Sequence, residues 1–232
     1  MGTLTKSELI SEISAFFGDR SDIIDSRIIR WLNLAQMRIG RLRDWQELEV
    51  LSNAASGTTA DDKFVVAPTN IRKIYSLRLI DGTHSRKLIR KPLRHFDTTI
   101  PYPERYATGR PEFYIYWGGR FELYKIPDAA YDLKLRYIKW PTDFATSTDV
   151  VSDLSQKDDA IIMLTVSWGM LSLRNNQDAN YYWSIYRSMI NEAAGEEVEG
   201  PDVDRTPDTN RPTTGAGEYY KNPFIDSMSQ VE

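Results

Sequence analysis

The chain has 232 residues, which is enough to bury a sizeable core in one or two domains. It contains no cysteine and two histidines, which excludes disulfides, zinc–thiolate sites, cysteine nucleophiles and multi-histidine metal sites. The formal net charge is −4, but residues 196–232 carry −6 and leave +2 on the rest, so the body lacks the basic surplus of a high-affinity DNA-binding protein. The longest uncharged stretch, residues 160–173, is too short to span a bilayer, and we expect no membrane partner.

Two helices are predicted near the N-terminus. Thr5 and Glu8 have capping-box spacing, and Gly18 can adopt the positive φ that ends a helix. A second helix is predicted to follow Asp22 and to run to about Arg43. Its apolar residues recur at the 3.6-residue period, with the arginines largely on other sides, and form one stripe: Ile24, Ile28, Trp31, Leu32, Ala35, Ile39 and Leu42.

The middle of the chain, residues 48–141, is rich in residues that favour strands. Asp81-Gly82 and Gly118-Gly119 are typical hairpin turns. Residues 131–137 alternate between apolar and polar, so Tyr131, Leu133, Leu135 and Tyr137 are expected to face a core. A short helix is predicted within residues 92–100, followed by a proline-rich loop.

Helical patterns return at Ser155. Residues 160–173 are mostly apolar, which predicts a helix buried on most sides. Residues 175–178 are read as a turn whose last residue caps a final helix, and Gly195 is expected to end that helix. The fold class is therefore predicted to be α+β: a four-helix bundle from the N- and C-terminal helix pairs, with an inserted antiparallel β domain.

The expected domain boundaries follow from these patterns. Residues 1–46 and 153–195 form the helical bundle domain, residues 47–152 the antiparallel β domain, and residues 196–232 an extended or disordered acidic tail. The tail has an aromatic and aliphatic cluster near its end, which is either a docking segment or part of a solvated terminus: Tyr219, Tyr220, Phe224 and Ile225.

No arrangement in the sequence supports catalysis, a metal site or a cofactor site. Asp158-Asp159 lies where a helix begins, and carboxylates there offset the helix dipole. His84 and His95 lack a serine–acid arrangement nearby. Three further acids could flank a sugar in a glycosidase, although nothing distinguishes them from surface acids: Glu104, Glu112 and Glu122.

The densest positive charge in the chain is a cluster of five residues: Arg86, Lys87, Arg90, Lys91 and Arg94. These side chains could contact phosphates, or acids on a neighbouring subunit, including the acidic tail of another copy. The alternative is a solvated hairpin edge, where basic residues discourage unwanted strand pairing.

Several blocks resemble the head-to-tail adaptor (connector, or neck) proteins of tailed bacteriophages. The group is similar to the tail tubular protein A and P22-type tail accessory factor proteins. The resemblance rests on the order of five blocks between residues 5 and 195: 28–45 with its closing Trp45, 64–74, 121–127, 131–141 with Trp140-Pro141, and 158–193.

The resemblance implies a structural virion protein, not an enzyme, that is assembled in the host cytoplasm and located at the neck between capsid and tail. It implies a homo-oligomeric ring, expected to be dodecameric, that binds the portal protein and the tail or next neck protein. The ring would continue the DNA channel, help retain and eject the genome, and contact passing double-stranded DNA without sequence specificity. The family's C-terminal segment often reaches the portal, which makes the tail cluster a candidate for docking there.

Two alternatives remain open from sequence. One is another tail-completion or tail structural protein that does not touch the portal. The other is a virion-associated cell-wall hydrolase, which a lytic assay would identify.

Overall fold

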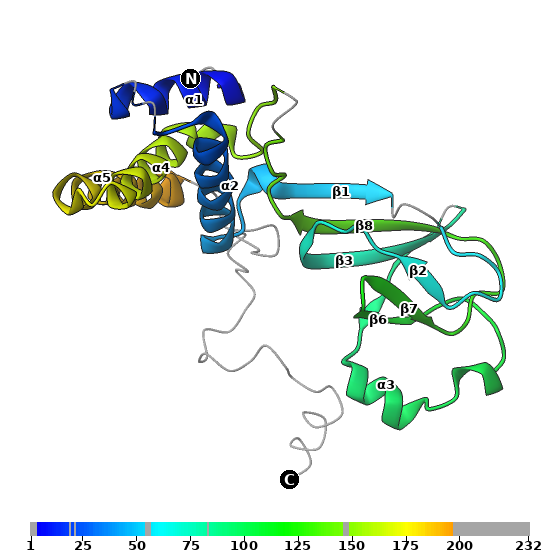
Figure 1. The fold of residues 1–232 in the computed structure, drawn as a ribbon. Helices are drawn as coiled ribbons and strands as arrows, with labels where there is room; N and C mark the ends of the chain where they lie inside the picture. Colours follow the sequence, from blue (N-terminus) through cyan, green and yellow to red (C-terminus); the bar gives the residue numbers. More distant parts are fainter. Residues whose placement is uncertain are drawn as a thin grey trace, which may run out of the picture. The chain divides into compact units, whose positions relative to one another are not determined.

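The computed structural model describes residues 4–18, 20, 22–53, 57–82, 84–145 and 149–196 (Figure 1). Helix α1, Lys6–Phe17, begins with the predicted capping box, because the Thr5 backbone N–H donates to the Glu8 carboxylate at 2.8 Å and the Thr5 hydroxyl accepts from the Glu8 N–H at 3.4 Å. Gly18 ends the helix with a φ of 66°. Local sequence signals therefore define both ends of α1, as predicted.

Helix α2, Asp25–Leu42, buries the middle of the predicted stripe but exposes its two ends. Ile28, Leu32 and Ile39 are fully buried, whereas Ile24 is 60% and Leu42 54% exposed. Ile24 and Leu42, at the two ends of the predicted stripe, therefore do not belong to the core. The start is also later than predicted, since Ile24 rather than Asp22 precedes the first helical residue.

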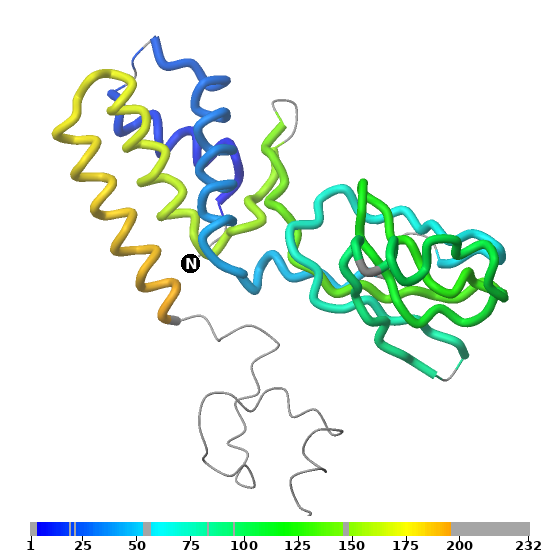
Figure 2. The backbone as a smooth tube through the Cα atoms, turned by 90° about the horizontal axis from the view of Figure 1, so that it is seen from below, coloured from blue at the N-terminus to red at the C-terminus, as the bar shows by residue number. Residues whose placement is uncertain are grey.

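The C-terminal pair consists of two helices, α4 (Asp158–Ser172) and α5 (Asn176–Glu196). A short 3-10 helix, η3 (Ser155–Lys157), comes directly before α4. Helix α4 lies between α2 and α5 (Figure 2) and also contacts α1. Most of its side chains are buried. The predicted turn at residues 175–178 is wrong: α5 already begins at Asn176, and the Asn175 side chain accepts from the Asp178 N–H at 3.3 Å. The helix continues one residue beyond Gly195.

Helices from both ends of the chain contribute to one hydrophobic core. Leu9 and Ile13 of α1, Leu32 of α2 and Leu164 of α4 are fully buried in it, and Tyr186 of α5 joins them. Helices from the N-terminal and C-terminal parts of the chain therefore pack together, as expected from the sequence. The strands lie between these helices along the chain. The predicted α+β class is confirmed.

The strands form two four-stranded sheets. The first has the order β1-β8-β3-β4, with β1 Glu49–Asn53, β3 Ile71–Asp81, β4 His84–Lys87 and β8 Asp132–Lys139, and all its pairs are antiparallel. The second has the order β2-β7-β6-β5, with β2 Phe64–Val66, β5 Ile89–Arg90, β6 Phe113–Trp117 and β7 Arg120–Tyr124. Both predicted hairpins are present, with positive φ at Gly82, Gly118 and Gly119.

One strand pair departs from the predicted antiparallel arrangement, because β5 runs parallel to β6. The chain leaves β4 at the edge of the first sheet, buries Leu88, and enters the second sheet as β5. The Leu88 N–H donates to the Leu77 carbonyl in β3 at 2.8 Å, and the Ile89 N–H donates to the Glu112 carbonyl beside β6 at 3.1 Å. This crossing strand ties the two sheets together.

Alternating residues of the two sheets form a second core. Leu133 and Leu135 of β8 are buried with Leu77 of β3 against Phe121 and Leu123 of β7. Tyr137 is also buried, as the alternation predicted, while Tyr131 lies just before β8 and is partly buried. The predicted short helix is α3, Leu93–Thr99, and its buried Phe96 packs with Ile115 of β6. Among the described residues, no helix is both long and apolar enough to span a membrane.

Candidate interaction surfaces and the junction between helices and sheets

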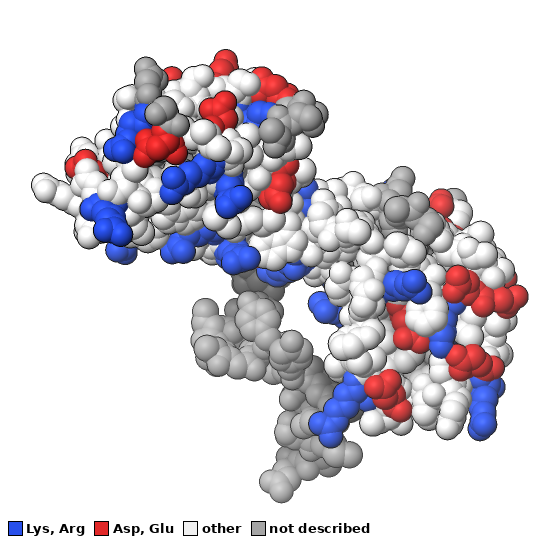
Figure 3. Space-filling model, viewed as in Figure 1, with Lys and Arg blue, Asp and Glu red and all other residues white. Residues whose placement is uncertain are grey.

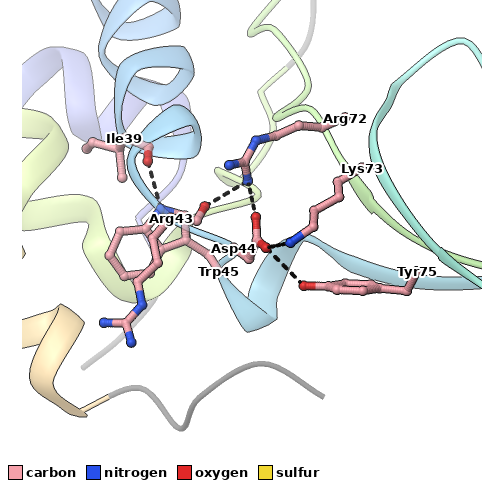
Figure 4. A network of polar contacts seen from close by, with 7 residues as sticks. All are labelled: Ile39, Arg43, Asp44, Trp45, Arg72, Lys73 and Tyr75. Atoms are coloured by element: carbon pink, nitrogen blue, oxygen red, sulfur yellow. Dashed lines mark hydrogen bonds and ion pairs between the residues drawn. The ribbon is translucent and has the colours of Figure 1, made fainter. Parts of the chain in front are cut away.

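The C-terminal end of α2 is joined to the first sheet through Trp45 (Figure 4). The Trp45 side chain is fully buried. Its indole N–H donates at 2.7 Å to the carbonyl of Ile39, which lies in the last turn of α2. The Lys157 ammonium lies 4.4 Å from the centre of the indole ring and pairs with Glu47 at 2.6 Å. The tryptophan thus links α2, the start of β1 and the start of α4.

Asp44 organises the polar side of the same junction. Its carboxylate pairs with Arg72 at 3.1 Å, forms an ion pair with Lys73, and accepts from the Tyr75 hydroxyl at 3.1 Å. Figure 4 shows these three side chains of β3 converging on Asp44. Partial burial by itself would raise the pKa of Asp44, but the hydrogen bond from Lys73 and the neighbouring charges hold it below its usual value. The carboxylate is therefore ionised at neutral pH and connects α2 to β3.

Trp140 and Pro141, at the end of β8, complete the junction. The guanidinium carbons of Arg41 and Arg72 lie 5.7 Å and 5.8 Å from the centre of the Trp140 ring. A Cβ atom on Gly40 would lie 2.9 Å from the Pro141 ring, so α2 approaches this segment as closely as glycine allows. Two blocks that were singled out separately in the sequence, Trp45 and Trp140-Pro141, therefore meet in one structural unit.

Asp158 is a buried carboxylate at the N-terminal end of α4. One oxygen accepts from the Leu4 N–H at 2.9 Å, while the other has no hydrogen-bond partner among the described residues. Burial raises the pKa of Asp158 to about 6, and the nearby carboxylates of Asp159 and Glu47 act in the same direction. Asp158 and Asp159 lie in the first turn of the helix, as predicted, but only Asp158 is buried.

We expect Asp158→Asn to stabilise the protein at pH 7.5 by about 1–2 kcal/mol. A carboxyl whose pKa is higher in the folded than in the unfolded state disfavours folding once it is ionised, so the gain should be full above pH 6 and absent below pH 4. Urea unfolding of the unsubstituted protein and of Asp158→Asn at pH 7.5 and pH 4 measures this gain in stability. Asp159→Asn, on the exposed neighbour, controls for the lost charge; a loss of stability at pH 7.5 in Asp158→Asn would contradict the assignment.

The five predicted basic residues are distributed along the crossing strand and the helix after it. Arg86 and Lys87 lie on β4, Arg90 on β5, Lys91 beside it and Arg94 on α3. All are exposed except Lys91, which is partly buried with its ammonium 5.2 Å from the centre of the Phe113 ring. None of the five has a carboxylate within 4.0 Å in the described part of the chain. Their charges thus lie along the edges of both sheets.

A second set of basic residues, which sequence reasoning did not assign to a surface, follows the exposed side of α2. Arg27, Arg30, Arg38 and Arg41 are all exposed, and three of them lie over tryptophan rings. The guanidinium of Arg38 is 5.0 Å from the centre of the Trp183 ring of α5. On the face shown in Figure 3, Lys and Arg side chains gather along the lower side of the helical part. The sequence signal for this basic surface was that these arginines lie off the apolar stripe of the predicted helix.

A groove lies between α2 and α5, with a cavity volume of about 350 Å³. Its apolar lining includes Trp45, Trp183 and Ile190, and its polar lining includes Arg38 and Arg187. The groove exists because α2 and α5 both pack on α4 (Figure 2). It could not be found from local sequence, because its two walls lie about 150 residues apart.

The acids considered for glycoside hydrolysis lie in ion pairs with lysine. Lys63 pairs with Glu104 at 2.5 Å and with Glu122 at 3.3 Å, and Lys125 lies 3.7 Å from Glu112. The hydrogen bond from Lys63 lowers the pKa of Glu104, whereas a general acid needs a raised pKa. No group of three or more metal-ligating side chains occurs within the described ranges, and His84 is exposed on β4.

The predicted docking residues Tyr219, Tyr220, Phe224 and Ile225 lie outside the described residues. Their role stays a prediction.

Comparison with known families gives a match over most of the chain. A family model described as SU10 adaptor protein matches residues 4–213, which include all the helices and strands of both sheets and continue 17 residues past the end of α5. No curated protein matches the chain. The match is longer at its C-terminal end than the range of 5 to 195 over which the sequence blocks show a resemblance.

Proposed function

The chain belongs to the SU10 adaptor protein family, a phage head-to-tail adaptor family, and from that premise we propose that it forms a ring between the portal and the tail of a phage particle. The ring continues the DNA channel and helps to retain and eject the genome. The observation that carries the proposal is the extent of the family match, which spans the helical core, the junction and both sheets.

The organisation of the chain supports a division of work within such a ring. Residues 1–46 and 153–195 are proposed as a four-helix bundle that packs side by side with neighbouring copies in a dodecamer. Residues 47–152 are proposed as the β domain that offers a surface to the tail or the next neck protein. The junction around Trp45 and Asp44 supports this division, because buried and ion-paired contacts hold α2 to the first sheet.

The basic residues on the sheet edges are proposed to contact either DNA phosphates or acids of a neighbouring subunit. Arg86, Lys87, Arg90 and Arg94 are exposed and lack a described carboxylate partner, so they can accept an external anion. Contacts of this kind recognise phosphate without reading sequence, which suits a channel through which a whole genome passes.

The end of the tail, residues 219–225, is proposed to dock on the portal. Aromatic and aliphatic anchors supply most of the energy of such docking, and ordering a segment on binding costs about 2–5 kcal/mol that the anchors must exceed. We therefore expect the double substitution Tyr220→Ala and Phe224→Ala to weaken binding to isolated portal rings at least about tenfold, since each tenfold step corresponds to about 1.4 kcal/mol.

Biolayer interferometry on immobilised portal rings measures that affinity, with circular dichroism to verify that the body remains folded. Ser227→Ala and Ser229→Ala, in the same segment, provide a matched control. Unchanged binding of the Tyr220→Ala and Phe224→Ala variant would contradict docking through the tail, but it would not contradict the adaptor role. Failure of the unsubstituted protein to bind the portal would contradict the adaptor role itself.

A further inference from the structure

The side of α2 that faces away from the core carries a straight row of basic residues. This arginine row consists of four exposed arginines and one exposed leucine: Arg27, Arg30, Leu34, Arg38 and Arg41. Each helical residue turns by about 100°, so the five residues fall within a sector of about 80°, opposite the buried Leu32 and Ile39. The row is about 21 Å long at 1.5 Å per residue.

Leu34 gives the arginine row an apolar centre. Its side chain is 53% exposed, and it lies one turn from Arg30 on one side and one turn from Arg38 on the other. A phosphate backbone would satisfy the guanidinium groups but would offer no apolar contact to the leucine. A protein face that combines acids with small side chains fits both the charges and the leucine.

The outward face of α1 has this complementary character. Two acids and two small residues share a sector of about 100°, opposite the buried Leu9: Glu8, Ser11, Glu12 and Ala15. Asp149 adds a third carboxylate beside them, because it accepts from the Ser7 N–H at 2.9 Å, and this hydrogen bond holds the pKa of Asp149 below its usual value. Lys6, the basic residue within Lys6–Phe17, is buried.

The charges of both faces lack partners within the chain. Among the described residues, no arginine of the row has a carboxylate within 4.0 Å, and neither Glu8 nor Glu12 has a lysine or arginine at that distance. On the view of Figure 3, acidic side chains gather toward the upper side of the helical part, where Figure 1 places α1, and basic side chains lie along its lower side. Two unlike faces of one molecule that match each other can join successive copies head to tail, and such a contact closes a ring when the rotation between copies allows it.

We propose that the outward face of α1 in one copy packs against the arginine row of the next copy. Leu34 enters the depression over Ser11 and Ala15, since small side chains let two helices approach to about 8–10 Å. The guanidinium groups on either side of the leucine pair with the two glutamates of α1. The lengths agree, because the twelve residues of α1 extend about 18 Å. The inference rests on the proposed ring, for which it names the surfaces that join neighbouring subunits.

Disulfide formation between copies tests the contact, because the chain contains no cysteine. Leu34→Cys and Ala15→Cys are made in separate chains and mixed in equal amounts under mild oxidation; both positions are exposed, so neither change disturbs the core. We expect the mixed disulfide to form about tenfold faster than either homodisulfide, because only unlike faces meet. Leu171→Cys is the matched control for Leu34→Cys, since Leu171 is 56% exposed on α4, and it should show no such preference for Ala15→Cys.

Charge exchange tests how the two faces recognise each other. Glu12→Arg in the Ala15→Cys chain should slow the mixed disulfide at least about tenfold, because it places like charges in contact. Arg30→Glu or Arg38→Glu in the Leu34→Cys chain should restore the rate, and the one that does so gives the direction in which the helices cross. Non-reducing electrophoresis and mass spectrometry measure the products.

The reactions are run on concentrated free protein and on portal rings saturated with protein. Portal rings that stay bare would contradict the proposed function, and the contact is then judged on the free protein. Equal rates of mixed and homodisulfides in both preparations would overturn the contact. So would protection of the cysteine at position 34 from alkylation by double-stranded DNA without a mixed disulfide, which would assign the arginine row to DNA.

Discussion

Replacing Trp45 with alanine is expected to lower the free energy of unfolding by about 3–5 kcal/mol. The indole is fully buried, its N–H satisfies the Ile39 carbonyl, and its face carries the Lys157 ammonium. Truncation leaves a cavity and removes both the indole donor to the Ile39 carbonyl and the aromatic ring beside the Lys157 ammonium. This is the largest single loss that we expect from a side chain at the junction.

Chemical denaturation followed by far-ultraviolet circular dichroism measures the loss. Trp117→Ala is the matched control, because Trp117 is 69% exposed at the tip of the β6–β7 hairpin and should change stability by no more than about 0.5 kcal/mol. A loss at Trp45 that is no greater than at Trp117 would mean that the junction does not depend on this side chain.

The second large effect is expected from Glu47→Gln, which should cost about 2–4 kcal/mol. The Lys157 side chain is only 4% exposed and its ammonium pairs with Glu47 at 2.6 Å. Glutamine keeps an acceptor for the Gln156 N–H, which donates to Glu47 at 2.8 Å in the unsubstituted protein, but it removes the negative charge that pairs with the buried Lys157 ammonium.

A variant without either charge separates the cost of the lost ion pair from that of an uncompensated buried cation. Glu47→Leu combined with Lys157→Met removes both charges, and the double variant should be more stable than Glu47→Gln alone. Urea unfolding at pH 7 provides the free energies. If the double variant were the less stable of the two, the loss in Glu47→Gln would not come from an uncompensated positive charge at Lys157.

Local sequence signals predicted those parts of the fold that are defined over a few residues. The Thr5 capping box, the glycine hairpin at residues 118–119 and the alternation along β8 are all present in the structure. Each depends on backbone conformation or periodicity, which neighbouring residues determine.

Features that depend on contacts distant in the chain could not be predicted in this way. The parallel β5–β6 pair follows from how the chain crosses between the sheets at Leu88, and the exposure of Leu42 depends on the packing of other elements around α2. The partners of Asp44 come from β3, about 30 residues later. The arginine groove requires α2 and α5 both to pack on α4. Side-chain type alone does not specify these partners.

The most direct test of the adaptor role is to mix the purified protein with portal rings of its phage and to image the product by electron microscopy. The proposal predicts a closed collar of copies stacked on one end of the portal, with the channel continuous through both rings. A chain truncated after Gly195 shows in the same experiment whether docking needs the tail. Portal rings that remain bare in the presence of excess full-length protein would contradict the account.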